Sequence, residues 1–211
     1  FAILRGAFSE GVPGPLADRT ILVIGSEVVI NDEGGSPAWS TLVQGDTIPI
    51  SLRKVVGAIH AATREERIVG IYLADGGPQV EDWSQRRELR TALDHFQAAG
   101  KRVWAHAGSW EAASWFLASG ADDLSIEPLG QFEFSGFAFQ MFYFAEALEK
   151  LGVQVQVTRV GKYKSAVEPF LLARSSPENE EQLAAVLEDL ERSVVEPAAA
   201  ARGVDPVTLS A

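Results

Sequence analysis

The sequence of 211 residues contains no cysteine, which excludes structural disulfides and metal sites built from thiolates. It also lacks an apolar run of about 20 residues, the length that a helix needs to cross a bilayer. No cluster of lysine and arginine offsets the net charge of −11. A nucleic-acid partner needs a basic face, so none is expected. Because the first residue is Phe1 rather than Met, we expect a piece of a longer protein, with an anchor or signal upstream.

Several catalytic signatures are missing as well. There is no G-x-S-x-G elbow, so a Ser-His-Asp hydrolase of that type is not supported. The turn at 76–78 lacks the G-x-G-x-x-G spacing, and no P-loop lysine is present, which disfavours nucleotide binding. His60, His95 and His106 are far apart and show no ligand spacing with a carboxylate. We therefore expect no metal site and no cofactor.

What the sequence does contain is a repeated alternation of strand and helix patterns. Short, nearly continuous apolar runs predict buried strands, and apolar residues at helical spacing predict helices packed by one face. Strands are expected at 21–24, 28–30, 68–73, 103–107, 124–127 and 153–157. Helices are expected at about 50–63, at 80–99, within 108–119, up to 150–152 and from 177 onward. Repeated βα units predict an α/β fold with a mostly parallel sheet flanked by helices.

The segments outside this pattern are a leading stretch, a loop and an aromatic stretch. Residues 1–20 are interpreted as a leading segment or short edge strand, and 31–45 as a surface loop. Residues 132–144 are rich in phenylalanine and begin with an alternation that indicates an exposed strand. Such a stretch belongs either to a core or to an interface. Ser176 and Pro177 supply an N-cap and a first helical residue, so residues 177–211 are expected to form a C-terminal helix.

Two places carry groups suited to catalysis. Lys162 and Lys164 follow the alternating valines of 153–157, and α/β proteins place functional groups after a strand. Lysines with this spacing are nevertheless more typically solvated. Gly76 and Gly77 follow the strand at 68–73, where their N–H groups could form an oxyanion hole or a substrate-binding turn. A plain tight turn between strand and helix is an equally open interpretation.

Residues 159–170 read Arg-Val-Gly-Lys-Tyr-Lys-Ser-Ala-Val-Glu-Pro-Phe. This segment resembles, almost without a break, the lysine motif of the signal peptide peptidase A family, also called protease IV, in its long two-repeat form. The segments 100–103, 117–119 and 134–137 resemble the same family. The resemblance implies a ClpP/crotonase-like fold and a serine protease with a Ser/Lys dyad that degrades cleaved signal peptides. It also implies a homotetramer associated with the exported side of the cytoplasmic membrane.

By its position in the motif, Lys164 would be the general base. The resemblance makes residues 1–211 a single domain, the amino-terminal repeat, ending in the start of a linker to a second repeat that carries the serine. A lysine base must be uncharged to accept the serine proton, and desolvation or a nearby cation such as Lys162 or Arg159 favours that form. We therefore expect Lys164 to be desolvated in the complete enzyme and the fragment alone to be inactive.

The family's other catalytic groups have poorer counterparts here. Where the short form of the family has a glycine-flanked serine, this chain has Ala112 or Ala113, and the nearby Ser114 is followed by Trp115. The turn at 75–77 reads Asp-Gly-Gly where the short form has Pro-Gly-Gly. One alternative is a catalytically silent module for ring assembly that uses the aromatic stretch. Another is a crotonase-type acyl-CoA enzyme, which shares the fold but leaves the lysine motif unexplained.

Overall fold

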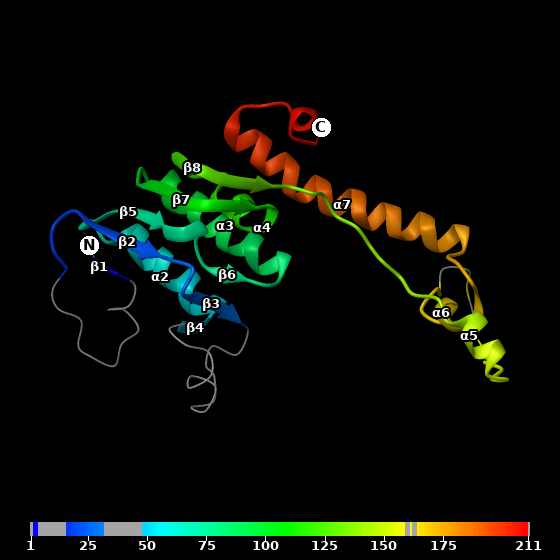
Figure 1. Ribbon diagram of the computed structural model, residues 1–211. Helices are drawn as coiled ribbons and strands as arrows, with labels where there is room; N and C mark the ends of the chain where they lie inside the picture. The colour runs from blue at the N-terminus through cyan, green and yellow to red at the C-terminus, as the bar shows by residue number, and fades with distance from the viewer. Residues whose placement is uncertain (1, 4–15, 32–47, 159–160, 162–163, 211) are drawn as a thin grey trace. The chain divides into compact units, whose positions relative to one another are not determined.

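The computed structural model describes residues 2–3, 16–31, 48–158, 161 and 164–210. The chain divides into two compact units (Figure 1). The sheet unit comprises Phe1–Ser135 with Ala200–Val204, and the motif unit comprises Gly136–Ala199 with Asp205–Ala211. The single domain over 1–211 stays a prediction. The loop expected at 31–45 and most of the leading segment lie outside the described residues.

The sheet unit is built on a five-stranded parallel sheet and a smaller three-stranded parallel sheet. The larger sheet has the order β1 (Ala2–Ile3), β2 (Thr20–Ile24), β5 (Ile68–Leu73), β7 (Arg102–Glu111) and β8 (Asp123–Glu133). The smaller sheet has the order β4 (Ile48–Ser51), β3 (Val28–Asn31) and β6 (Gln79–Val80). The chain thus adds β3 and β4 to the smaller sheet after β2, and adds β6 after β5. This confirms the predicted α/β class and is a ClpP/crotonase-like arrangement.

The sheet unit has three helices, each within or close to a range in which the sequence predicts a helix. They are α2 (Leu52–Arg64), α3 (Trp83–Ala98) and α4 (Ala112–Ala118). Helix α2 buries Val55 and Ile59, which lie four residues apart and therefore on one face. Helix α3 begins three residues later than the sequence suggests, because the Asp82 side chain accepts a hydrogen bond from Ser84 N at 2.6 Å and caps the helix there.

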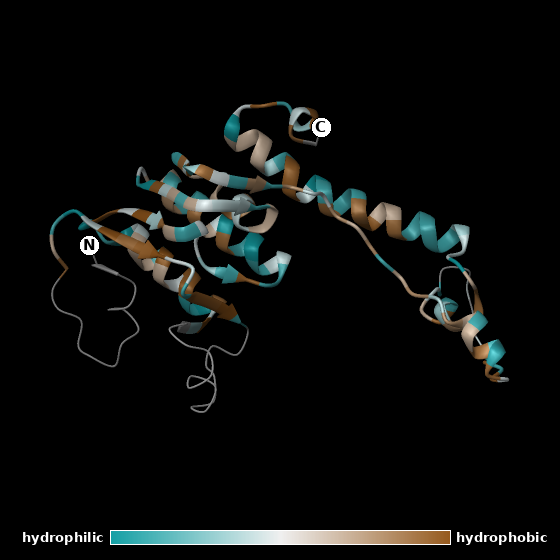
Figure 2. Cartoon of the chain, in the orientation of Figure 1, coloured by the Kyte–Doolittle hydropathy of each residue, from teal (hydrophilic) through white to brown (hydrophobic). Residues whose placement is uncertain are grey.

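The core of the sheet unit is apolar and well covered. Ile71, Val103, Phe96 and Phe116 are almost fully buried. Figure 2 shows hydrophobic residues along β2 and β3. Strand β7 runs to Glu111, beyond the predicted end at 107, since its last residues pair with the end of β8 after an irregularity in the register. Backbone pairing therefore lengthens both strands beyond their apolar runs.

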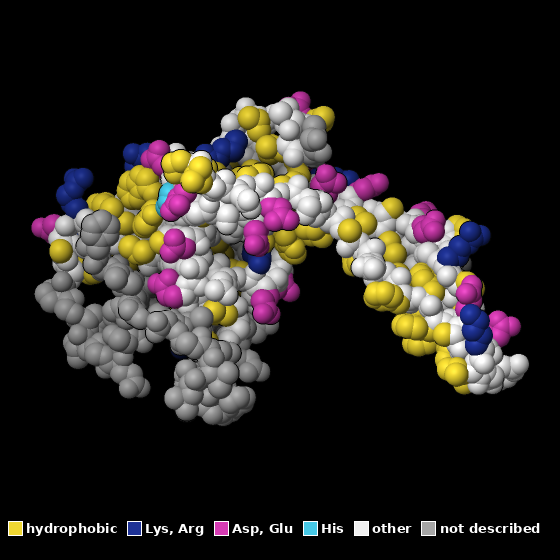
Figure 3. Space-filling model, in the orientation of Figure 1, with side chains coloured by type: hydrophobic (Ala, Val, Ile, Leu, Met, Phe, Trp, Pro, Cys, Tyr) yellow, Lys and Arg dark blue, Asp and Glu magenta, His cyan; other side chains and the backbone are white. Residues whose placement is uncertain are grey.

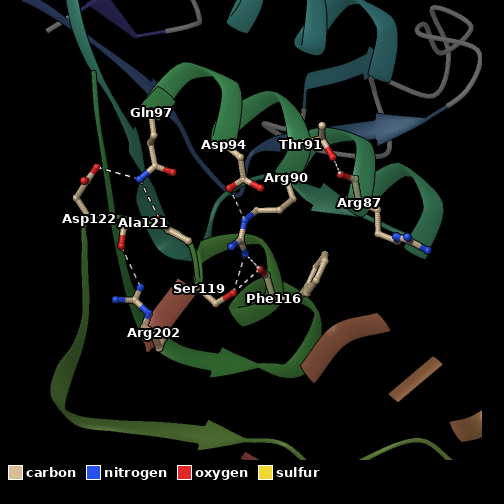
Figure 4. A network of polar contacts seen from close by, with 11 residues as sticks. Arg87, Arg90, Thr91, Asp94, Gln97, Phe116, Ser119, Ala121, Asp122 and Arg202 are labelled. Atoms are coloured by element: carbon tan, nitrogen blue, oxygen red, sulfur yellow. Dashed lines mark hydrogen bonds and ion pairs between the residues drawn. The ribbon is translucent and has the colours of Figure 1, made fainter. Parts of the chain in front are cut away.

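A buried arginine ties α3 to the end of α4 (Figure 4). Arg90 Nε donates to Asp94 Oδ1 at 2.8 Å, and Nη1 donates to Ser119 Oγ at 2.7 Å. The same nitrogen also donates to a backbone carbonyl of α4 at 2.7 Å. Arg202 Nη2 donates to the carbonyl of Ala121 at 3.1 Å, which fixes the last turn of α7 to this unit. The three bonds of Arg90 give hydrogen-bond partners to a guanidinium that would otherwise be costly to bury.

The motif unit is helical. Its helices are α5 (Ala145–Lys150), α6 (Glu168–Leu171), α8 (Pro206–Ser210) and most of α7 (Pro177–Arg202). Helix α7 begins where the sequence predicts, because Ser176 Oγ accepts the N–H of Asn179 at 3.2 Å as an N-cap. None of the helices within the described residues has both the length and the apolarity to cross a membrane.

The predicted strand at 153–157 is wrong. These residues form neither strand nor helix, and Val153 and Val157 are exposed. Alternating valines predict a segment with two different faces, but a strand forms only where a neighbour satisfies its N–H and C=O groups. No strand of the described residues pairs with this segment. The alternation alone does not reveal whether such a neighbour exists.

The aromatic stretch is largely exposed. Strand β8 ends at Glu133, and the chain then forms no helix or strand until α5. Phe132 on β8 is exposed, as the alternation predicts, and Phe139 and Phe142 beyond it are exposed as well. Figure 3 shows hydrophobic side chains gathered on the surface of the motif unit. These phenylalanines therefore do not form a core within this chain.

Candidate active-site residues

The residues that the sequence singles out lie in different units. Gly76 and Gly77 belong to the sheet unit, and Lys164 belongs to the motif unit. The sheet unit has a cavity of about 440 Å³, lined by the turn at 74–78, strand β6, the end of β7 and the start of α4. It lies at the carboxyl ends of β5 and β7, where α/β proteins bind their ligands.

The glycine turn that lines this cavity is tightly wound. Asp75 has φ 49°, Gly76 has φ 83°, and Gly77 has φ 81° with ψ −167°, a combination that is essentially open only to glycine. The N–H of Gly77 donates to the carbonyl of Ala74 at 2.9 Å. One of the two donors considered for an oxyanion hole is therefore used inside the turn.

Ser114 is the hydroxyl nearest to this turn. A Cβ built on Gly76 would lie 3.5 Å from the Cβ of Ser114, so the two residues are neighbours across the cavity. The Ser114 hydroxyl accepts the N–H of Glu111 at 3.3 Å and donates to the carbonyl of Glu111 at 3.2 Å. Ser114 thus belongs to a capping box that begins α4. Ala113 also lines the cavity, and its methyl group supplies no nucleophile.

Arg86 is the cation of the cavity. Its guanidinium carbon lies 5.3 Å from the centroid of the Trp83 ring, and its Nε is buried without a hydrogen-bond partner among the described residues. Burial lowers the pKa of Arg86, while Asp82 and Glu111 act in the opposite direction. The cavity is therefore polar and of mixed charge. The carboxylate next to Ser114 is that of Glu111, which accepts the backbone N–H of Ser114 within a capping box.

A serine and a histidine do meet elsewhere in the sheet unit. His106 Nδ1 lies 3.0 Å from Ser125 Oγ. Asp123 is held by Arg102 Nη2 at 2.8 Å, and Ser125 Oγ lies 3.3 Å from the carbonyl of Ala105. The carboxylate is thus paired with an arginine, so this is not a Ser-His-Asp relay. The rings of the other two histidines lie 6.2 Å apart, and the described residues form no cluster of three metal ligands.

Lys164 is exposed and lies just before a turn that leads into α6. The N–H of Glu168 donates to the carbonyl of Ser165 at 2.9 Å and closes this turn. Arg159, Lys162 and Tyr163 of the motif lie outside the described residues. The structure thus places Lys164 beside a hydrogen-bonded turn within the motif unit.

Glu168 is a residue that sequence reasoning missed. It is buried, although glutamate is rarely buried unless it is paired. Its carboxylate accepts the hydroxyl of Ser176 at 2.7 Å and the N–H of Ser176 at 3.1 Å. The available signal was a single charge within the otherwise apolar run 166–173.

Comparison with known proteins identifies relatives of the chain. The model of Peptidase family S49 matches residues 95–211. Protease 4 of Haemophilus influenzae is 37% identical over 131 residues, which cover 61% of this chain and 21% of that protein. Protease 4 of Salmonella typhi is 34% identical over 159 residues, covering 75% of this chain and 26% of that protein. The chloroplastic serine protease SPPA of Arabidopsis thaliana is 27% identical over 141 residues, covering 67% and 21%. These matches span about a quarter of the length of the curated relatives.

Proposed function

Because the chain belongs to Peptidase family S49, we propose that it is the lysine-bearing part of a serine protease with a Ser/Lys dyad. Lys164 is the general base, and the serine is supplied by a second repeat outside this chain. The observation that carries this proposal is the almost unbroken lysine motif, found in a chain whose Ser114, the serine nearest to the family's position, is used in a helix cap. The relatives named as proteases support the reaction class.

The chemistry assigns one task to each group. Uncharged Lys164 Nζ accepts the proton of the serine hydroxyl while the serine oxygen attacks the scissile carbonyl. The protonated lysine then gives that proton to the leaving amine, and water cleaves the acyl-enzyme by the same route. Gly76 and Gly77 contribute a substrate-binding wall in this proposal, since the N–H of Gly77 already serves the turn.

The proposed substrates are cleaved signal peptides, degraded at the exported side of the cytoplasmic membrane. The support for this substrate class is the resemblance of residues 159–170 to the lysine motif of the signal peptide peptidase family. A signal peptide carries an apolar segment of roughly 7 to 15 residues, so a protease that degrades it must accept apolar side chains. Attachment to the membrane would come from a segment outside the described residues.

The proposed partners are the second repeat and further copies of the protein, assembled as a homotetramer. The exposed apolar side chains of the motif unit support an interface there, since large exposed apolar patches mark interaction sites. Phe142, Leu151 and Phe170 are among them. The segment 154–158 supports the same conclusion, because no strand of the described residues pairs with it and a neighbouring chain could satisfy its backbone groups.

The test is Lys164→Ala in the full-length protein, assayed by hydrolysis of an apolar signal-peptide substrate. We expect kcat/KM to fall by about 10⁴-fold or more, as when other proteases lose their base. The matched control is Lys162→Ala, which removes a neighbouring cation rather than the base itself and should cost far less activity than Lys164→Ala. The 211-residue chain alone should not hydrolyse the substrate. Full activity of Lys164→Ala would refute the assignment. A full-length protein that neither cleaves peptides nor reacts with a serine-directed fluorophosphonate would instead favour a silent assembly module.

A further inference from the structure

We propose that Glu168 is a positioning residue for the general base. Glu168 anchors the turn beside Lys164 to the N-terminus of α7. The inference rests on the proposed function, because it assumes that Lys164 is the base. Glu168 itself does not touch the substrate. It acts through the backbone of the turn and through Ser176.

The first observation is the burial of a carboxylate within the motif unit. Glu168 is 1% exposed. A buried carboxylate is unfavourable unless hydrogen-bond donors surround it. Two donors come from one residue, since the N–H and the hydroxyl of Ser176 reach the two carboxylate oxygens at 3.1 and 2.7 Å. The carboxylate also lies at the N-terminus of a long helix, where a negative charge is favoured.

The second observation is the form of the cap on α7. In a capping box, the N-cap hydroxyl accepts the N3 backbone N–H, and an N3 glutamate accepts the N-cap N–H. Here Ser176 accepts the N–H of Asn179 at 3.2 Å, but the N3 residue is Asn179 itself. The Asn179 side chain is buried and donates to Ser175 Oγ at 2.8 Å instead. Glu168, eight residues upstream, accepts the N-cap N–H and so completes the box from another helix.

The third observation connects this cap to the lysine. The N–H of Glu168 closes the turn on Ser165, the residue next to Lys164. The following carbonyl, of Pro169, accepts the N–H of Phe144 at 2.6 Å. The backbone around Glu168 is therefore held from several sides. A base must be positioned to a fraction of an ångström, so a shift of this turn reaches the reacting nitrogen.

The experiment compares Glu168→Gln with wild type in the full-length protein. Glutamine keeps the size of the side chain but removes its charge. Only its oxygen can accept a hydrogen bond, so the two bonds from the N–H and the hydroxyl of Ser176 to separate acceptor oxygens cannot both be kept. We expect kcat to fall by about 10- to 100-fold, as a displacement near 1 Å would cause, with KM changed by less than about twofold. The matched control is Glu180→Gln, which removes an exposed glutamate from the first turn of the same helix. It should leave kcat unchanged.

A double-mutant cycle with Ser176→Ala separates positioning through the cap from an independent effect of charge. If Glu168 acts through Ser176, the double variant should have nearly the kcat of Glu168→Gln alone. If the fold-loss in kcat of the double variant equals the product of the losses of the two single variants, the two residues act independently and the proposal is overturned. If Glu168→Gln fails to fold, Ser176→Ala decides by itself. A fall in its kcat at constant KM supports the proposal, and an unchanged kcat overturns it.

Lys164→Ala, measured in the same series, distinguishes the two possible failures. If Lys164→Ala remains active, the proposed function itself is wrong. If Lys164→Ala is inactive while Glu168→Gln retains the wild-type kcat, only the positioning role is wrong. If Glu168→Gln loses thermal stability but not kcat, the positioning role is also wrong, because Glu168 then only stabilises the cap of α7.

Discussion

The two units of the chain differ in how many apolar side chains they bury. Most of the buried apolar side chains described belong to the sheet unit. The motif unit buries apolar side chains of α7 between Val194 and Ala199, together with the polar Glu168 and Asn179. Most of the exposed large apolar side chains belong to the motif unit. The sheet unit therefore covers its own apolar surface. The motif unit buries a carboxylate that is hydrogen-bonded to Ser176 and leaves many large apolar side chains exposed.

The same contrast holds for the groups considered for catalysis. The cavity of the sheet unit depends on backbone conformation at Gly77 and on a capping hydroxyl at Ser114. The motif unit presents a side chain, Lys164, beside a turn that the backbone N–H of the buried Glu168 closes. A structural change should therefore have different consequences in the two units. Substitutions in the sheet unit should change the free energy of unfolding, and substitutions in the motif unit should change assembly or turnover.

The largest expected difference in stability is between two phenylalanines. Phe96 is fully buried in the sheet unit, and Phe142 is 67% exposed in the motif unit. Phe96→Ala should lower the free energy of unfolding of the chain by about 3 to 5 kcal/mol, because it removes buried apolar surface and leaves a cavity. Phe142→Ala should change it by less than about 0.5 kcal/mol, as is usual for surface substitutions. Urea unfolding of the 211-residue chain measures both.

Assembly should show the opposite order. In the full-length protein, Phe142→Ala should shift sedimentation toward smaller species, because it removes apolar surface from the proposed interface. If Phe142→Ala instead destabilised the chain as much as Phe96→Ala, the motif unit would have an aromatic core of its own. The comparison between the units would then fail.

Prediction of the fold from sequence succeeded where one local signal was sufficient. The strand at 68–73 was predicted to the residue from one apolar run, and the start of α7 was predicted from a serine cap followed by proline. It failed where the outcome depends on a neighbour. The pairing that extends β7 and the short strand β6 depend on other strands. The alternation at 153–157 has no strand beside it among the described residues.

The candidate site follows the same rule. Lys164 was identified from an almost continuous motif, a local signal, and its role as base remains a prediction. The resemblance puts Ser114 near the position of the family's serine, and this stays a prediction. Only the structure shows the Ser114 hydroxyl bonded to Glu111. Glu168 was missed because its partner, Ser176, belongs to another helix. A capping box completed from outside its own helix has no fixed spacing that a sequence pattern could reveal.

A smaller effect is expected for the glycine turn of the sheet unit. Gly77→Ala should lower the free energy of unfolding by about 1 to 3 kcal/mol, because alanine is strained at φ 81° and ψ −167°. Crowding adds little, since the new Cβ would lie 3.5 Å or more from Leu73 and Leu117. The matched control is Gly57→Ala on the exposed side of α2, where a Cβ meets nothing within 4 Å. There alanine should stabilise the chain by about 0.5 to 1 kcal/mol.

If Gly77→Ala were as mild as Gly57→Ala, the turn would not depend on its backbone conformation. The cavity of the sheet unit would then be more adaptable than its geometry indicates. Thermal unfolding of the two variants in parallel decides this, and the hydrogen bond from Gly77 to Ala74 provides a second observable through its amide exchange.

The smallest expected effect concerns a surface ion pair of the sheet unit and its dependence on pH. The hydrogen bond from the Arg67 side chain lowers the pKa of Glu65 from 4.5 to about 2. A carboxylate with a lowered pKa stabilises the fold above its unfolded value, and this contribution is lost as pH falls toward the folded value. The stability difference between wild type and Glu65→Gln should therefore be constant above pH 5.5 and shrink between about pH 4.5 and 2.

Glu66→Gln removes the neighbouring charge and controls for net charge. Because both partners of the pair are partly exposed, the difference should be small and should fall further in high salt. A difference that grows as the solution is acidified would contradict the assigned direction.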